Sequence, residues 1–167
     1  MKVFDWKKGV KDTLLTPYDS IRYYKHFLHS GLLSIEPQTG HIKAWVGGIN
    51  SRYFQYDHVQ QGKRQVGSTF KPFVYASVID QLQISPCEKY PNTPYTIPKE
   101  AYGMEEAWTP KNSGDKYGGE LTLKRALAKS VNVITARLIH RVGPKTVVRL
   151  AKKAGITSYV PPYPSIA

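Results

Sequence analysis

The segment that most constrains the fold is the apolar run Phe73-Val74-Tyr75-Ala76-Ser77-Val78-Ile79, which directly follows Pro72. Wound as a helix, this run is apolar on nearly every face, which is typical of a helix buried by its neighbours. Proline is favoured in the first turn of a helix, so Pro72 marks where this one begins. The sequence therefore predicts a buried helix around which the rest of the chain packs.

Ser68 and Lys71 stand three positions apart immediately before this run. If the turn between them is helical, the hydroxyl and the amine lie one above the other and can meet. Serine alone is a weak nucleophile, but a desolvated lysine can take its proton. Gly67 allows another backbone or a substrate to come close. The segment predicts an acylation site, although Ser-x-x-Lys also arises by chance and a serine here would suit a helix cap.

Composition narrows the classes of function. With 167 residues the chain is long enough for one domain with a real core. A single cysteine, Cys87, excludes an internal disulfide framework and a thiolate metal cluster. The five histidines form no convincing pair of metal ligands. No stretch approaches the roughly 18 apolar residues of a membrane span, and we expect no signal peptide at the start.

The charge is unevenly distributed along the chain. The net charge is +12, and Glu120 is the last carboxylate, so the basic residues after it are unopposed. They fall at helical spacings between apolar residues, and no nucleic-acid-binding motif accompanies them. A solvated helix face, an anionic substrate or an anionic membrane surface each fits this pattern better than a nucleic acid.

The remaining segments have distinct local patterns. Residues 1–15 are mixed and aperiodic and predict a linker or an edge segment. Thr16-Pro17 opens a helix that we expect to run to about Ser30, with Ile21, Tyr24 and Leu28 facing the core. The other expected elements are strands over 32–35 and 41–46, an irregular stretch over 85–119, and helices opening at Thr122, Val133 and Pro144.

Two further groups of polar residues are candidates for the site. Ser130 shares a helix face with Leu123, and Asn132 follows just beyond it, so both would be polar groups on the core side that need partners. Trp108 through Asn112 lies in the irregular stretch. That segment is either the rim of a cleft or, more simply, an aromatic side chain that pins a loop to the surface.

The two motifs together resemble a known family. Ser68-Thr69-Phe70-Lys71 followed by Ser130-Val131-Asn132 is similar to the first two boxes of the penicillin-binding proteins, which are serine transpeptidases. The wider phrases Gly31 to Gly48, Gln65 to Pro72, Trp108 to Asn112 and Leu121 to Asn132 resemble the class A, bifunctional members. The resemblance covers roughly residues 16–167. It implies an α+β fold, an antiparallel sheet plus a helical subdomain, of which this chain is the N-terminal part.

The resemblance also implies a role for each matched residue. Ser68 would attack the carbonyl of a D-Ala-D-Ala stem peptide, and Lys71 would take its proton. Ser130 would relay a proton to the leaving group, and Asn132 would bind the substrate amide. Gly67, Trp108 and Asn112 would contribute to substrate binding. The family would bind peptidoglycan stem peptides and β-lactam antibiotics outside the cytoplasmic membrane, with no metal, no organic cofactor and no nucleic acid.

Departures from the family pattern are equally specific. The third box, Lys-Thr-Gly or a variant, is absent, and the only Lys-Thr, Lys145-Thr146, is followed by valine within an expected helix. We therefore expect a piece of a larger protein, cut on both sides, whose membrane anchor is missing and which is inactive alone. A class A lactamase is disfavoured because no acid follows Glu120 and Val131 stands where those enzymes carry aspartate. A non-catalytic basic module that binds peptidoglycan or anionic lipid remains the alternative.

Overall fold

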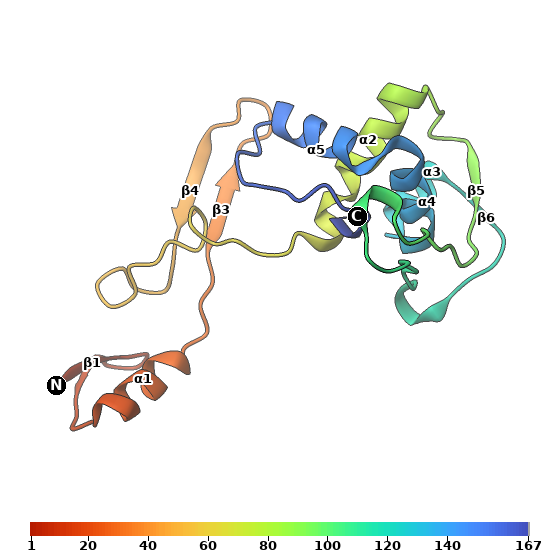
Figure 1. Cartoon of the computed structure of the whole chain (residues 1–167). Coiled ribbons are helices and arrows are strands. Elements are labelled where there is room, and N and C mark those ends of the chain that lie inside the picture. The colour runs from red at the N-terminus through yellow and green to blue at the C-terminus, as the bar shows by residue number, and fades with distance from the viewer. Residues whose placement is uncertain (167) are drawn as a thin grey trace. The chain divides into compact units, whose positions relative to one another are not determined.

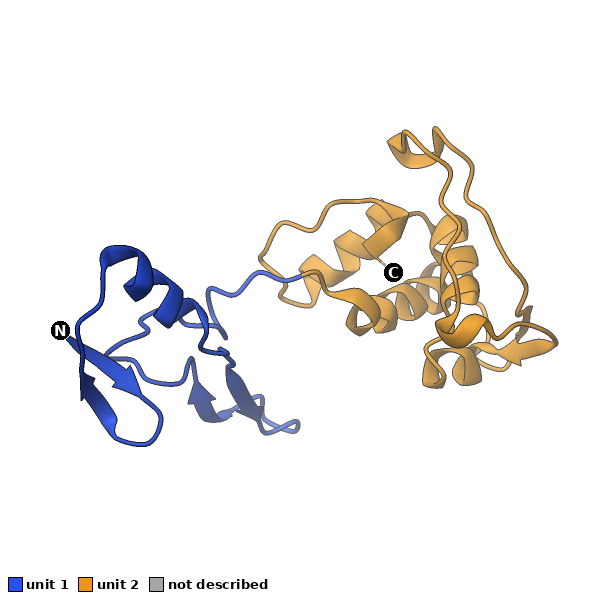
Figure 2. Ribbon diagram, turned by 90° about the horizontal axis from the view of Figure 1, so that it is seen from below, with its two compact units in different colours: residues 1–64 blue, residues 65–167 orange. Residues whose placement is uncertain are grey.

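The computed structural model describes residues 1–166 and divides the chain into two compact units (Figures 1 and 2). Unit 1 comprises residues 1–64 and contains two β-hairpins and a helix. Unit 2 begins at residue 65 and is mainly helical. Ser68, Lys71, Ser130 and Asn132 all belong to unit 2, so the candidate site can be described within one unit.

Residues 2–12 form a hairpin and not a linker. Strands β1 (Lys2–Asp5) and β2 (Gly9–Asp12) pair in antiparallel fashion. Phe4 is buried, and its ring contacts the rings of Phe27 and Phe54 at centroid distances of 5.3 and 5.5 Å. Of the two alternatives for residues 1–15, a linker or an edge segment, the paired strands favour the second. The rings that bury Phe4 come from positions far along the chain, which a short aperiodic segment cannot reveal.

Helix α1 (Pro17–Lys25) begins as predicted but ends earlier. The side chain of Thr16 accepts a hydrogen bond from the backbone N–H of Asp19 at 3.1 Å, which is the expected N-cap. The helix ends at Lys25 and does not reach Ser30.

The face of α1 that packs also differs in part from the prediction. Ile21 and Leu28 are 60% and 88% exposed. Tyr23 packs instead, and its hydroxyl donates to the carbonyl of Phe4 at 2.7 Å. The amphipathic pattern was right for Tyr24, which is half-buried with its ring 5.7 Å from that of Phe54. It was wrong for Ile21 and Leu28, because aromatic packing decided which side is covered.

Strands β3 (Leu32–Ile35) and β4 (Ile42–Val46) form the predicted second hairpin. The register shifts between Ser34 and Ile35, as expected for a bulge near the turn. Gly40 supplies the positive φ of 73° that this turn needs. The side chains of both strands are exposed on either face.

Asp57 organises the loop that follows β4. Its carboxylate accepts hydrogen bonds from the backbone N–H groups of Val59 and Gln60 at 2.8 and 3.0 Å and from Trp45 Nε1 at 2.8 Å. The bonds from Gln60 and Trp45 lower the pKa of this carboxyl group. A Cβ at Gly47 would lie 2.6 Å from the same carboxylate, so glycine is required there by close approach.

Unit 2 is built around the helix that follows the serine. The described helices of this unit are η1 (Gly67–Phe70), a 3-10 turn, and α2 (Lys71–Leu82), α3 (Leu123–Ala128), α4 (Asn132–Val142) and α5 (Pro144–Lys153). Helix α2 packs against α4 and α5. Val74 and Val78 are fully buried against Ile134 and Leu138, whereas Ile79 is 38% exposed. The predicted burial of α2 is therefore confirmed for one face.

The stretch over 85–119 contains short elements that lack a recognisable period. Strand β5 (Lys89–Pro91) pairs with β6 (Glu120–Thr122), and an isolated antiparallel bridge joins Ile97 to Trp108. The 3-10 turns η2 (Ala101–Gly103), η3 (Ser113–Asp115) and η4 (Pro164–Ile166) complete the described elements. Residues of these pairings, among them Ile97 and Trp108, pack against the helical core of unit 2.

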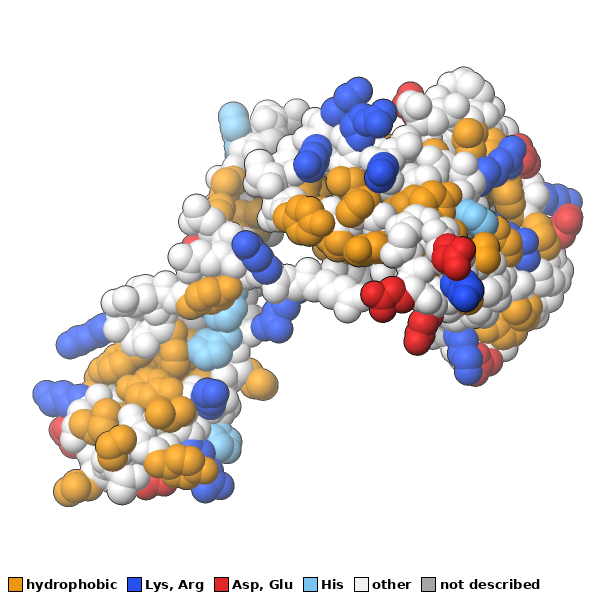
Figure 3. Space-filling view, in the orientation of Figure 1, with side chains coloured by type: hydrophobic (Ala, Val, Ile, Leu, Met, Phe, Trp, Pro, Cys, Tyr) orange, Lys and Arg blue, Asp and Glu red, His pale blue; other side chains and the backbone are white. Residues whose placement is uncertain are grey.

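Unopposed basic residues lie on the surface of unit 2. Lys and Arg side chains gather over α5 on the face shown in Figure 3. Lys145, Arg149 and Lys152 of this helix are exposed, which is compatible with each of the three interpretations that the sequence left open. None of the helices in residues 1–166 has the length and apolar character needed to cross a membrane.

Candidate active site

Ser68 and Lys71 lie one helical turn apart, as the Ser-x-x-Lys spacing predicts. Ser68 is in η1, and Lys71 is the first residue of α2. The backbone N–H of Lys71 donates to the carbonyl of Ser68, which closes this turn. The two side chains have opposite surroundings, because Ser68 is exposed and Lys71 is only 1% exposed.

Gly67 adopts a backbone conformation that favours glycine. Its φ is 52°, which a residue with a Cβ adopts only with strain. A Cβ built at this position would meet no described atom within 4 Å. Glycine is thus required by the turn before Ser68, and its role in the approach of a substrate stays a prediction.

The ammonium group of Lys71 joins the two sequence motifs. Its Nζ donates to the backbone carbonyl of Ser130 at 2.7 Å, to Ser130 Oγ at 3.0 Å and to Asn132 Oδ1 at 2.5 Å. These partners lie 59 and 61 residues away in the sequence. An ammonium has three N–H donors, so all of them are matched. The structure therefore brings the Ser68 motif and the Ser130 motif together, through Lys71.

Burial changes the acidity of Lys71. Removal from water lowers its pKa from the ordinary 10.5 to about 8, because the charged form loses its hydration. The three groups bonded to Nζ are neutral. The sequence predicted a desolvated lysine, and desolvation is the cause of the lowered pKa. A lysine with this pKa is partly neutral near pH 7 and can act as a base.

The connection between α3 and α4 places Ser130 and Asn132 next to Lys71. Thr122 caps α3, and its side chain accepts from the N–H of Arg125 at 3.3 Å. The helix ends at Ala128, two residues before Ser130, whose φ of 52° lies in the left-handed region. Ser130 is therefore not a continuation of the α3 face, and it is exposed where the sequence predicted burial. The reversal of the backbone, which periodicity does not show, decides its position.

Asn132 is fixed at both ends of its side chain. Oδ1 accepts from Lys71, and Nδ2 donates to the backbone carbonyl of Lys111 at 2.7 Å. The carbonyl of Lys111 was not predicted to take part in the site. Its only signal in the sequence is its place within the Trp108 to Asn112 segment that the resemblance had already marked.

Asn112 makes contacts with the start of α4 that the sequence did not predict. It is 8% exposed, and its Oδ1 accepts from the backbone N–H groups of Asn132 and Val133 at 3.0 and 3.2 Å. Its Nδ2 donates to Asn92 Oδ1 at 2.8 Å and to the carbonyl of Lys116 at 2.9 Å. The donors and the acceptor of the Asn112 side chain all have protein partners, and substrate binding by Asn112 stays a prediction. Asn92 was missed because a buried asparagine in an irregular stretch resembles an ordinary turn residue.

Trp108 lies among contacts other than those of the Lys71 group. Its backbone exchanges two hydrogen bonds of 2.9 Å with Ile97, and its side chain packs against the helical core. It also lines a pocket of about 410 Å³ together with Met104 and Tyr163. This arrangement fits an aromatic residue that pins a loop, and substrate binding by Trp108 stays a prediction.

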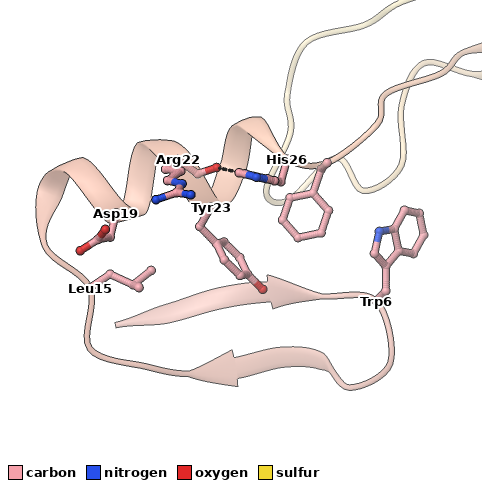
Figure 4. A pocket seen from close by; sticks show the side chains of 7 residues that line it. Trp6, Leu15, Asp19, Arg22, Tyr23 and His26 are labelled. Atoms are coloured by element: carbon pink, nitrogen blue, oxygen red, sulfur yellow. Dashed lines mark hydrogen bonds between the residues drawn. The ribbon is translucent and has the colours of Figure 1, made fainter.

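A separate pocket of about 390 Å³ lies in unit 1 (Figure 4). It is lined by side chains of α1 and of the segments around it, namely Trp6, Leu15, Asp19, Arg22, Tyr23, His26 and Phe27. His26 Nδ1 donates to the carbonyl of Arg22 at 2.6 Å, and the hydroxyl of Tyr23 already donates to Phe4. None of the predicted site residues lines this pocket.

Comparison with known proteins places this site in a family. The family model described as the penicillin binding protein transpeptidase domain matches residues 31–161. The chain belongs to this family. A second model, described as the penicillin-binding protein middle domain, matches residues 1–28.

Individual relatives agree with the family assignment. The chain is similar to penicillin-binding protein 1A of Aquifex aeolicus, with 37% identity over 81% of this chain and 18% of that protein. It is 35% identical to penicillin-binding protein 1A of Neisseria flavescens, over 81% of this chain and 16% of that protein. The chain thus spans less than a fifth of these relatives' lengths. The resemblance to a class A penicillin-binding transpeptidase that the sequence motifs indicated is confirmed.

Solved structures support the same fold. The crystal structure of penicillin-binding protein 1A from Haemophilus influenzae matches with a TM-score of 0.70 and 30% identity, over 80% of this chain and 20% of that one. The penicillin-binding protein PonA1 of Mycobacterium tuberculosis, in complex with penicillin V, matches with a TM-score of 0.63 and 26% identity, over 86% and 37%. The predicted α+β class is confirmed, with small antiparallel strand pairs beside a helical unit.

Proposed function

We propose that this chain carries the nucleophile, the base and the first substrate contacts of a serine D,D-transpeptidase that cross-links peptidoglycan stem peptides. The observation that carries the proposal is Lys71, which lies one helical turn after Ser68. Its amine is buried, has a pKa lowered to about 8, and is hydrogen-bonded to Ser130 and Asn132. Family membership supplies the reaction class, and the side chains present suit it.

The reaction runs in two acyl transfers. Ser68 Oγ attacks the carbonyl of the penultimate D-Ala, its proton passes to neutral Lys71 Nζ, and a C–O bond forms. The C–N bond to the terminal D-Ala breaks, and the leaving amine receives a proton through the hydroxyl of Ser130. The amine of a neighbouring stem then attacks the ester carbonyl, a new C–N bond forms, and the C–O bond to Ser68 breaks. The proton that the amine loses passes to Ser68 Oγ and restores its hydroxyl. Asn132 binds the substrate amide with the second N–H of Nδ2 and the second lone pair of Oδ1, which its bonds to Lys111 and Lys71 do not use.

Lys71 must change partners during this cycle. Its donors are matched by Ser130 and Asn132, and Ser68 makes no side-chain hydrogen bond to another described residue. When the amine is neutral it has two N–H donors and a lone pair, and the lone pair is free to accept from Ser68 Oγ. The lowered pKa of Lys71 makes that state accessible near neutral pH.

We further propose that the parent protein acts at the extracytoplasmic face of the bacterial membrane. The same serine would be acylated by β-lactam antibiotics. The alternative, a non-catalytic basic module, is not favoured. Binding to a surface does not require a buried lysine of the Ser68 motif that is hydrogen-bonded to the Ser130 motif.

The proposal is tested by labelling the parent protein with a fluorescent penicillin. Ser68→Ala should abolish covalent labelling and leave the fold intact, because the serine is exposed and its hydroxyl has no partner to lose. Lys71→Arg should be nearly as damaging, since a guanidinium cannot give up its proton at neutral pH. Labelling of the alanine variant at the full rate would show that Ser68 is not the nucleophile. Near-normal labelling of the arginine variant would remove Lys71 from the role of base.

A further inference from the structure

Helix α4 begins without a cap from its own sequence. The residue in the N-cap position is Val131, whose side chain cannot accept a hydrogen bond. The first N–H groups of a helix have no partners within it and need acceptors from elsewhere. Here the acceptor is Asn112 Oδ1, which takes the N–H groups of Asn132 and Val133 from 20 and 21 residues away.

The same asparagine is held rigidly from behind. Its Nδ2 donates to Asn92 and to the carbonyl of Lys116, and both asparagines are at least nine-tenths buried. Asn92 also exchanges backbone hydrogen bonds with Gly118 and Gly119, at 2.8 and 3.0 Å. The amide group of Asn112 therefore has one orientation, with its oxygen directed at α4.

The orientation of the Asn112 amide affects Lys71 through a single residue, Asn132. Asn132 is the first residue of α4, so the bond from its N–H to Asn112 fixes the backbone from which its side chain extends. The neighbouring carbonyl of Lys111 fixes the Nδ2 end of that side chain, which leaves Oδ1 directed at Lys71 Nζ. Lys111 and Asn112, two consecutive residues of the 85–119 stretch, thus hold Asn132 at its side chain and at its backbone.

We propose that Asn112 is a positioning residue of the active site, which sets the place of Asn132 and thereby the hydrogen bonding of Lys71. Its side-chain donors and acceptor are all bonded within the protein, so it acts on Lys71 through Asn132. This inference rests on the proposed function, in which Lys71 is the base.

The test uses the parent protein and the rate of acylation by a fluorescent penicillin across pH. Asn112→Ala leaves two buried N–H groups without an acceptor and lets Asn132 move. We expect acylation on the pH plateau to fall by ~10-fold to ~100-fold, the range typical of displacing a catalytic group by about 1 Å. The acidic limb of the profile should move to lower pH, because Asn132 Oδ1 no longer stabilises the charged form of Lys71.

Asn112→Asp is the conservative variant that keeps the test decisive if the alanine variant does not fold. Its carboxylate retains the acceptor for Asn132 and Val133, negative charge is favoured at a helix N-terminus, and Asn92 can turn its amide to donate to it. Only the carbonyl of Lys116 loses its donor from this position. We expect plateau acylation within about fivefold of the wild type, with the acidic limb moved to higher pH because an anion stabilises the Lys71 ammonium. A folded aspartate variant that acylates at less than one tenth of the wild-type rate would overturn the proposal.

Asn92→Ala is the matched control for damage to the same stretch. It removes one partner of Asn112 Nδ2 but leaves the acceptor for α4 in place. Amide hydrogen exchange at Asn132 and Val133 should accelerate in Asn112→Ala far more than in Asn92→Ala. Equal acylation losses in these two variants, or an acidic limb that does not move, would reduce Asn112 to a structural residue. If Ser68→Ala were still labelled, the proposed function itself would fail, so the two failures are distinguishable.

Discussion

At the residue scale, Lys71 balances two opposing effects. Its burial penalises the ammonium form, whereas three neutral acceptors stabilise that form. The net result is a lowered pKa of about 8, so burial is the larger effect. A fully hydrogen-bonded ammonium is thus kept within reach of deprotonation, which an exposed lysine with a pKa near 10.4 would not be.

The lowered pKa predicts how acylation depends on pH. The neutral amine is the active form, so the rate constant for penicillin acylation of the parent protein should rise with pH, reach half its maximum near pH 8 and level off above it. Stopped-flow or gel-based labelling between pH 6 and 10 measures this profile. A rate constant that stays flat over this range, or that falls as pH rises through 8, would contradict the assignment of Lys71 as base.

At the scale of elements, the junction between α3 and α4 places both polar residues of the second motif. Ser130 occupies the left-handed region with φ 52°, which costs a residue with a Cβ roughly 1–2 kcal/mol. In exchange, its carbonyl and its hydroxyl both face Lys71 Nζ. The strain and the function are located in the same residue, and substitutions can separate them.

Ser130→Gly and Ser130→Ala make that separation. Both remove the hydroxyl and should slow acylation to a similar extent, but glycine accepts the left-handed conformation and alanine does not. We expect the glycine variant to be more stable than the alanine variant by about 1 kcal/mol, measured by urea unfolding of the transpeptidase domain. Equal unfolding midpoints for the two variants would show that the strain at Ser130 is not significant.

At the scale of the whole molecule, the two units differ in how well they bury their apolar residues. Unit 2 has a core in which Val74, Ile134 and Leu138 are fully buried. In unit 1, the β3–β4 hairpin has only two strands and leaves Leu32 and Ile42 55% and 53% exposed. A two-stranded sheet alone is marginally stable, so the helical unit should be the more stable part of this chain.

This contrast predicts the behaviour of the 167-residue chain by itself. We expect a loosely packed or poorly soluble chain in which amide exchange is slow in α2 and α4 and fast in β3 and β4. Because the sequence lacks a third box, an expected oxyanion donor is missing, and penicillin labelling should be at least ~100-fold slower than in the full domain. Labelling at the full domain's rate, or slow exchange in the hairpin, would contradict this view.

The sequence by itself determined much of this protein's local structure. The caps at Thr16 and Thr122, the prolines that open α1, α2 and α5, and the β3–β4 hairpin all follow from short-range hydrogen bonding and backbone preferences. These effects act between residues a few positions apart. The Ser68 and Ser130 motifs also identified the family, because their residue types and spacing are specific.

Only the tertiary structure decided which distant groups meet. The face of α1 that packs was set by Phe4 and Phe54, and the conformation of Ser130 by its contact with Lys71 across the helical unit. Asn112 is the sharpest case. As a residue type it suits substrate binding and helix capping equally, and its donors and acceptor were assigned by Asn92 and the start of α4, each 20 residues away. Periodicity has no access to partners at such separations, because they are chosen by packing and not by local conformation.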